Sequence, residues 1–226
     1  MSQPSESATA TEVQAVLFDV GGVLVELGGL EVFRGWSDST LSDDEIWKLW
    51  LGSPAVRAFE LGQIEAAAFA RDLVEELNLP VGHDHFLDAF TAWPKGLLPG
   101  VEDLLGRLRS GLKRATLSNT NALHWPRTME EMGLGPLFDW HFPSHETGRI
   151  KPDAEAFHQV AEALGLAPAE IFFLDDTRIN VAAARAAGFQ AEQALGVEAA
   201  ERVLSARGLL AGETTAAASE QEGAQS

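Results

Sequence analysis

The segment from Ala15 to Gly22 constrains the fold of this chain more than any other part of it. Four consecutive apolar residues, Ala15 to Phe18, are followed by Asp19, and two glycines come shortly after. A short apolar run of this kind is typical of a strand that is buried on both faces of a parallel sheet. Ligands bind just beyond the carboxyl ends of such strands, so Asp19 is expected where chemistry takes place. Taken alone, an Asp before two glycines also fits a turn or a cap.

Polar residues follow two later segments that we expect to form strands of the same sheet. They are Ser118 and Asn119 after residues 114–117, and Asp175 and Asp176 after residues 171–174. Between these segments an isolated basic residue, Lys151, stands before a proline. Because the carboxyl ends of parallel strands meet at one edge of a sheet, we expect these side chains to converge with Asp19 there.

This order of Asp, Ser-Asn, Lys and Asp-Asp resembles the haloacid dehalogenase (HAD) superfamily of aspartate-nucleophile hydrolases, over about residues 13–208. The segment LSNTNALH, residues 117–124, is similar to the second motif of the bacterial alpha-D-glucose-1-phosphate phosphatase-like branch. The resemblance implies an α/β fold: a doubly wound, mainly parallel sheet with a Rossmann-like core and an inserted all-helical cap domain.

The alternation of strands and helices stops between residues 30 and 97, where no convincing strand is found. Helices are expected at residues 42–51, 54–61, 65–77 and 83–93, the first of them opened by a capping box at Ser42. We therefore predict a core at 13–29 and 98–210, a helical cap at 30–97, and disordered tails at 1–12 and 211–226. An extra helical subdomain with no role at the site is the alternative. The cap carries twelve acidic and five basic residues, which disfavours a phosphate site within the cap itself.

By the resemblance, Asp19 is the nucleophile that forms an aspartyl-phosphate, and Lys151 is the second catalytic residue. Ser118, Asn119 and Gly22 are predicted to bind the phosphate, through a hydroxyl and backbone N–H groups. From the residues alone, Ser118 and Asn119 are equally compatible with a helix N-cap. A lysine before a helix is more often a solvated surface residue.

The resemblance also implies a Mg²⁺ cofactor, which prefers oxygen ligands. The predicted ligands are Asp19, the backbone carbonyl of Gly21 and Asp176, with Asp175 supporting the metal's water shell or the loop. Asn180 matches the next metal-site position of the family. A helix N-cap is the alternative for the Asp pair. Two adjacent acids that close a buried strand are costly without a cation, which favours a metal.

Gly21 departs from the pattern, because most phosphatases of the superfamily have at this position an aspartate that acts as general acid and base. Glu60 and His124 are candidates for its replacement. Without an acid, the enzyme should prefer anomeric sugar phosphates over primary phosphate esters, because an anomeric oxygen carries negative charge more easily as it leaves. Dehalogenases of the superfamily also lack this aspartate, but their fourth motif is less acidic than Asp175-Asp176.

The sequence therefore predicts a Mg²⁺-dependent phosphatase that acts on a small phosphorylated metabolite. A metal-independent 2-haloacid dehalogenase and a catalytically weakened protein that binds a phosphometabolite are the alternatives. The net charge of −18 disfavours nucleic-acid partners and anionic membranes. The apolar runs are too short to span a bilayer, and residues 1–12 lack signal-peptide features. The absence of cysteine fits the cytoplasm. We expect a monomer or a weak homodimer.

Overall fold

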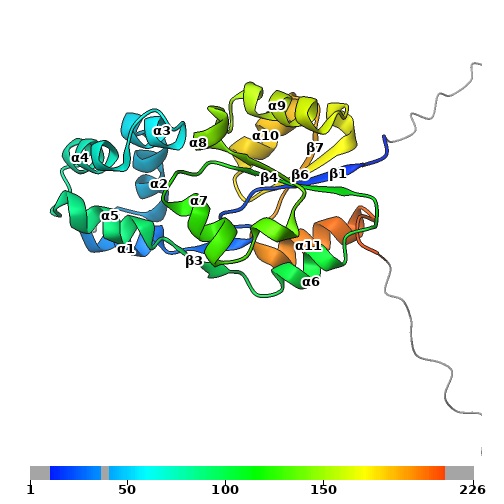
Figure 1. Cartoon of the computed structure of the whole chain (residues 1–226), viewed down its shortest axis with the longest axis horizontal. Helices are drawn as coiled ribbons and strands as arrows, with labels where there is room; N and C mark the ends of the chain where they lie inside the picture. Colours follow the sequence, from blue (N-terminus) through cyan, green and yellow to red (C-terminus); the bar gives the residue numbers. More distant parts are fainter. Residues whose placement is uncertain (1–10, 37–40, 212–226) are drawn as a thin grey trace, which may run out of the picture.

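A five-stranded parallel sheet forms the centre of the molecule (Figure 1). The computed structural model describes residues 11–36 and 41–211. The strands lie in the order β5-β4-β1-β6-β7, and every neighbouring pair is parallel. Their bounds are β1 Ala15–Phe18, β4 Lys113–Ser118, β5 Trp140–Pro143, β6 Ile171–Asp175 and β7 Gln190–Gln193. The predicted fold class is confirmed, and Asp19 follows the central strand between the ends of β4 and β6.

Helices cover both faces of this sheet, because β1 is apolar on both sides. Val16 and Phe18 point into one core, and Ala15 and Leu17 into the other, as the alternation of side chains along a strand requires. In Figure 1, α9 (Ala154–Leu164) and α10 (Arg178–Ala186) lie above the sheet, and α6 (Val101–Gly106) and α11 (Gly196–Ala206) lie below it. This double cover makes the sheet edge beyond the strand ends a natural place for a site.

The helical insertion lies beside the sheet, at the left of Figure 1. Its described helices are α1 Gly29–Trp36, α2 Asp43–Gly52, α3 Pro54–Glu60, α4 Ala66–Glu76 and α5 His83–Thr91. The expected capping box at Ser42 is present. Helix α1 was not predicted, because glycines at both of its ends obscure the pattern. Residues 37–40 lie outside the described part.

An antiparallel pair of short strands, β2 (Val25–Leu27) and β3 (Pro94–Leu97), joins the insertion to the core. The prediction that no strand lies between residues 30 and 97 is therefore wrong at its end. Proline and glycine, which are depleted in strands, make up half of β3 and hide it from pattern reading. This β-ribbon pairs the segment that enters the insertion with the segment that leaves it, and β2 lies shortly after Asp19 in the sequence.

The sequence also predicts core helices over about residues 101–112 and 121–132, and the structure differs from both predictions. The helix predicted over residues 101–112 ends at Gly106, and Leu108 instead pairs with Leu210 in an isolated bridge. The helix predicted over residues 121–132 is divided into α7 (His124–Pro126) and a π-helical turn, η1 (Arg127–Glu131). The remaining short elements are η2 Gly135–Leu137, α8 Ser144–Thr147 and η3 Pro168–Glu170.

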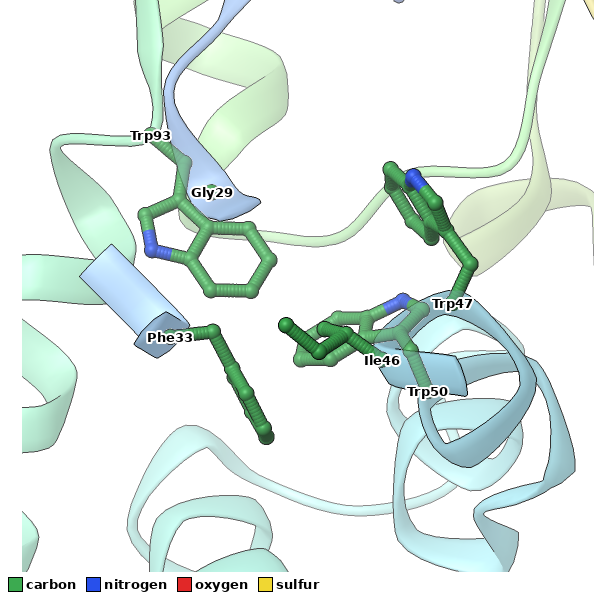
Figure 2. Close-up of a pocket in the computed structure, with 6 residues that line it drawn as sticks. All are labelled: Gly29, Phe33, Ile46, Trp47, Trp50 and Trp93. Atoms are coloured by element: carbon green, nitrogen blue, oxygen red, sulfur yellow. The ribbon is translucent and has the colours of Figure 1, made fainter. Parts of the chain in front are cut away.

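Aromatic side chains fill the core of the insertion. Trp50 and Trp93 are buried there with their ring centroids 4.6 Å apart, and Trp36 packs at the edge of the same cluster. Figure 2 shows Trp47 at the border of an apolar hollow near Trp50, where it remains 38% exposed. Packing therefore accounts for three of the four tryptophans here.

The two ends of the described chain contact the core. The backbone carbonyl of Thr11 accepts a hydrogen bond from Gln190, and the N–H of Ala211 donates to Arg107. The predictions for residues 1–10 and 212–226 fall outside the described residues. Among the described helices, none has the length and apolar character needed to cross a membrane.

Replacement of Phe69, which is fully buried among Phe59, Phe86, Phe90 and Trp50, tests this cluster. Phe69→Ala should lower the free energy of unfolding by about 3–5 kcal/mol, because it removes a large buried ring and leaves a cavity. Urea unfolding followed by tryptophan fluorescence measures this. Leu49→Ala, at a side chain that is 42% exposed, is the control. An equal loss in both variants would contradict the assignment of Phe69 to the core.

Candidate active site

A buried lysine joins two of the strand ends at the carboxyl edge of the sheet. The Nζ atom of Lys151 lies 2.7 Å from Asp19 Oδ1 and 2.7 Å from Asp175 Oδ2. Lys151 is 3% exposed and Asp175 is fully buried. The alternative that Lys151 is a solvated surface residue is therefore wrong. A buried ammonium requires such partners, because an unpaired buried charge is very costly.

Asp175 is saturated by protein donors. Its Oδ1 accepts the Thr177 N–H at 2.8 Å, and the side-chain amide of Asn180 lies 3.1 Å from both of its carboxylate oxygens. With Lys151 on Oδ2, this carboxylate is held by three partners. Asp175 and Asn180 therefore form the support of the site, beneath the neighbouring acid.

Asp176 is held differently and leaves one oxygen available. Its Oδ1 accepts the Thr177 hydroxyl at 2.9 Å, while Oδ2 faces the backbone of Gly22. A Cβ atom built on Gly22 would lie 2.5 Å from this oxygen, and the φ of Gly22 is +72°. Only glycine combines that conformation with so close an approach. Gly22 thus allows the loop after β1 to meet the loop after β6.

The three acids form a compact oxygen cluster. Asp19, Asp175 and Asp176 each offer a carboxylate oxygen, and these lie within 4.8 Å of one another. Burial, and then the charges of Asp175 and Asp176, raise the pKa of Asp19 to about 8 despite the opposing charge of Lys151. Burial and the charge of Asp175 also raise the pKa of Asp176.

Lys151 stays protonated in this cluster. Burial alone lowers its pKa, but the charges of Asp175 and Asp19 raise the pKa above its ordinary value. One ammonium thus faces three carboxyl groups, and the raised pKa values of Asp19 and Asp176 show that it does not compensate all three when they are ionised. A divalent cation that prefers hard oxygen ligands, such as Mg²⁺, fits this donor set.

The loop after β4 adjoins the cluster. Ser118 is buried at the end of β4, next to β1. The Asn119 side chain donates to the Lys151 carbonyl and accepts from the Lys151 N–H, both at 2.9 Å. Its amide thus fixes the lysine, and only its backbone N–H remains for the predicted phosphate contact. Sequence reasoning missed this clamp, because the two residues are 32 positions apart.

A second link also escaped sequence reasoning. Ser144 donates its hydroxyl hydrogen to the carbonyl of Thr120 and accepts the Thr120 N–H, at 3.0 and 2.9 Å. Ser144 directly follows β5, so its position at a strand end was the available signal. The pair holds the loop after β4 against α8.

His124 serves as a contact between the core and the insertion. Its Nε2 lies 2.7 Å from the carbonyl of Phe90 on α5 and its Nδ1 lies 3.2 Å from the Asn121 amide nitrogen. Because a carbonyl only accepts, Nε2 carries the hydrogen and donates. Burial lowers the pKa of His124 to about 4. The imidazole is therefore neutral and occupied on both nitrogens, which removes it as a proton donor at neutral pH.

A side chain at position 21 would have to displace the end of the Leu27 side chain. A Cβ atom built on Gly21 would lie 2.8 Å from Leu27 Cδ1. Leu27 belongs to β2 and is 45% exposed. The space in which the family's second aspartate would begin is thus taken by the exposed side chain of Leu27.

Residues 13–188 match the family model of haloacid dehalogenase-like hydrolases. The chain belongs to this family. The match covers the strand ends that carry the three acids, the lysine and the Ser-Asn pair, together with the whole helical insertion.

Curated relatives of this family member include phosphatases. A phosphoglycolate phosphatase of Pseudomonas putida (strain KT2440) is 33% identical over 181 residues, which span 76% of this chain and 60% of that protein. A probable phosphoglycolate phosphatase of Pseudomonas putida is 29% identical over 155 residues, which span 66% of this chain and 60% of that protein. The match thus spans about three fifths of these relatives' length.

A solved structure agrees in fold. A HAD family enzyme from Bacteroides thetaiotaomicron, in complex with magnesium and inorganic phosphate, superposes with a TM-score of 0.65 at 26% sequence identity. The alignment covers 80% of this chain and 94% of that one. Most of the family member described here is therefore represented in the structure of a HAD family enzyme.

Substitution of Gly22 tests the contact with Asp176. Gly22→Ala places an L residue at positive φ, which costs about 1–2 kcal/mol, and pushes Asp176 Oδ2 away from the cluster. Gly133→Ala is the matched control, because its φ is +74° and a Cβ there meets nothing within 4 Å. Urea unfolding should show a loss from the positive φ in both variants, while Mg²⁺ titration calorimetry should detect weaker binding only in Gly22→Ala. Unchanged Mg²⁺ affinity in Gly22→Ala would refute the assignment of Asp176 as a ligand.

Proposed function

We propose that this protein is a Mg²⁺-dependent phosphatase that hydrolyses a small phosphorylated metabolite through an aspartyl-phosphate on Asp19. The cluster of Asp19, Asp175 and Asp176 around the Lys151 ammonium is the observation that carries the proposal. The phosphatase names of the curated relatives and the magnesium and phosphate in the Bacteroides structure support it.

The residues of the site have two roles, nucleophilic attack on phosphorus and neutralisation of the negative charge. Asp19 is the nucleophile, and its Oδ1 is held by the Val20 N–H at 2.7 Å and by Lys151. Lys151 stabilises both the nucleophile and the negative charge of the transferring phosphoryl group. Ser118, with the backbone N–H groups of the adjoining loop, binds the phosphate oxygens. Phosphoryl transfer depends mainly on such positioning and electrostatic stabilisation.

The proposed metal ligands are the carboxylates of Asp19 and Asp176 and the carbonyl of Gly21, with Asp175 orienting Lys151 and the loop. When bound, Mg²⁺ supplies positive charge that neutralises the phosphate and keeps Asp19 ionised. Asp175 serves this site indirectly, because its oxygens are already engaged by Lys151, Thr177 and Asn180.

For the substrate we propose a sugar phosphate or a similarly small phosphate ester. The names of the relatives make 2-phosphoglycolate a second compound to test. The predicted preference for anomeric phosphates holds only where no acid protonates the leaving oxygen, so it depends on which residue replaces the missing aspartate. A metal-independent dehalogenase is less well supported, because a reaction without a metal does not require the additional carboxylates of Asp175 and Asp176 beside Asp19.

Asp19→Asn should reduce phosphatase activity to below about 10⁻³ of the wild-type rate, because removal of a nucleophile costs orders of magnitude. The amide is nearly isosteric, so thermal unfolding should change little. Initial rates of phosphate release on a panel of sugar phosphates and 2-phosphoglycolate measure the effect. Asp84→Asn, an exposed acid on α5, should keep wild-type activity. Turnover by Asp19→Asn at the wild-type rate would exclude the covalent mechanism.

Removal of the metal separates the three candidate functions. Phosphate release should stop in EDTA and return with added Mg²⁺, because without the cation the pKa of Asp19 is about 8 and the nucleophile is mainly protonated at neutral pH. Halide release from a 2-haloacid that persists in EDTA would instead identify a dehalogenase. Tight binding of a phosphorylated ligand with no turnover across the panel would identify a phosphometabolite-binding protein.

A further inference from the structure

We propose that Glu60, at the C-terminal end of α3, is the general acid of the first chemical step and the general base of the second. It would fill the role that position 21 cannot, since Gly21 has no side chain and Leu27 occupies the adjoining space. The inference rests on the proposed phosphatase function and adds to it a catalytic residue supplied by the helical insertion.

Two contacts on either side of Glu60 hold its helix end against the sheet edge. Three residues before it, Arg57 lies 2.5 Å from Asp153 Oδ2 in an ion pair, and Asp153 follows the Lys151 loop by two residues. Two residues after it, the turn at Gly62 approaches α8 so closely that a Cβ atom there would lie 2.2 Å from the His145 carbonyl oxygen. Glu60 is therefore bracketed between the Lys151 loop and the segment after β5.

The Glu60 carboxyl is not used to hold the structure together. Within the described part of the chain it takes part in no side-chain hydrogen bond and no ion pair, although it is half-buried. Burial raises the pKa of Glu60 to about 7, against the opposing charges of Lys151 and Arg57. An acid with this pKa exchanges a proton readily at neutral pH, as general acid–base catalysis requires.

The direction of the reaction also favours a donor on the insertion. Attacking and leaving oxygens lie roughly in line in phosphoryl transfer. With Asp19 attacking from the sheet edge, the leaving oxygen points away from the sheet. Glu60 belongs to the insertion, which lies beside the sheet at the left of Figure 1, whereas His124 is held by Phe90 and Asn121 and stays neutral.

The two steps balance with Glu60 as proton carrier. In the first step a bond forms between Asp19 Oδ and phosphorus, the bond from phosphorus to the ester oxygen breaks, and the Glu60 proton passes to the leaving alkoxide. In the second step water attacks phosphorus, one water proton returns to the Glu60 carboxylate, and the bond to Asp19 breaks. The products are an alcohol and inorganic phosphate, and Glu60 regains its starting state.

The dependence of rate on the leaving group tests this role in the full-length protein with Mg²⁺. Glu60→Gln should lower kcat/KM for glucose 6-phosphate by about 10²–10⁴-fold, the usual contribution of a positioned acid. The loss for 4-nitrophenyl phosphate should be much smaller, because nitrophenolate leaves without a proton. Both rates come from one sample, so their ratio is independent of the folded fraction. Glu75→Gln, an exposed acid on α4, is the matched control and should leave the ratio unchanged.

Each outcome decides between the proposals. A large selective loss for glucose 6-phosphate supports Glu60 as the acid, and the anomeric preference predicted for an enzyme without an acid should then emerge in Glu60→Gln. Equal losses for both substrates, or no loss, would overturn the role of Glu60 while the phosphatase function stands. If the wild-type protein hydrolyses no phosphate ester, the phosphatase function fails and the role of Glu60 fails with it.

The pH profile gives a second readout. The charged or titratable groups around Glu60 are Arg57 on its own helix, Lys151 and Asp153 in and after the lysine loop, and His145 on α8, whose pKa is lowered by burial. Glu60 can donate only when protonated, so wild-type kcat/KM for glucose 6-phosphate should fall as the pH rises through about 7. Glu60→Gln should not show this fall in kcat/KM, which forms the alkaline limb of the pH profile. The same limb in both proteins would assign it to another group and count against Glu60.

Discussion

The burial of the Lys151 ammonium is the constraint on which the site depends. A charge that is 3% exposed must be paired in place, and its two partners come from the ends of adjacent strands, Asp19 after β1 and Asp175 on β6. Asn119, after β4, then fixes the lysine backbone from the other side. Three strand ends and one loop are thus locked into a single arrangement, and the spare acid, Asp176, is left facing the same space.

Three contacts hold the helical insertion against the core. His124 bonds to the end of α5, and Arg57 and the Gly62 turn bind α3 to the segments beyond β5 and Lys151. The same insertion brings Leu27 against Gly21. Under the proposal that Glu60 is the general acid, the insertion supplies a functional group to the site, and a lid in this position would couple closure over a substrate to proton transfer.

Much of the core could be predicted because its signals are local. Apolar runs of four residues that end on Asp identified β1 and β6, a shorter segment before Ser118 identified β4, and parallel strands must place those ends at one edge. The ribbon of β2 and β3 could not be found this way. Its strands lie about 70 residues apart in the sequence, and Pro94 and Gly96 break the pattern that marks a strand.

For the site, the sequence by itself determined which chemical groups are present: the acids at two strand ends, one lysine, and glycine where the family has a second aspartate. Only the tertiary structure decided which of those groups is held by protein donors and which is available to a ligand. Asp175 and Asp176 are adjacent and chemically identical, yet one is saturated by donors and the other keeps an oxygen available. Glu60 and His124 were equal candidates until burial and hydrogen bonding separated them. The reason is physical, because ionisation and hydrogen bonding depend on neighbours that folding brings from distant parts of the chain.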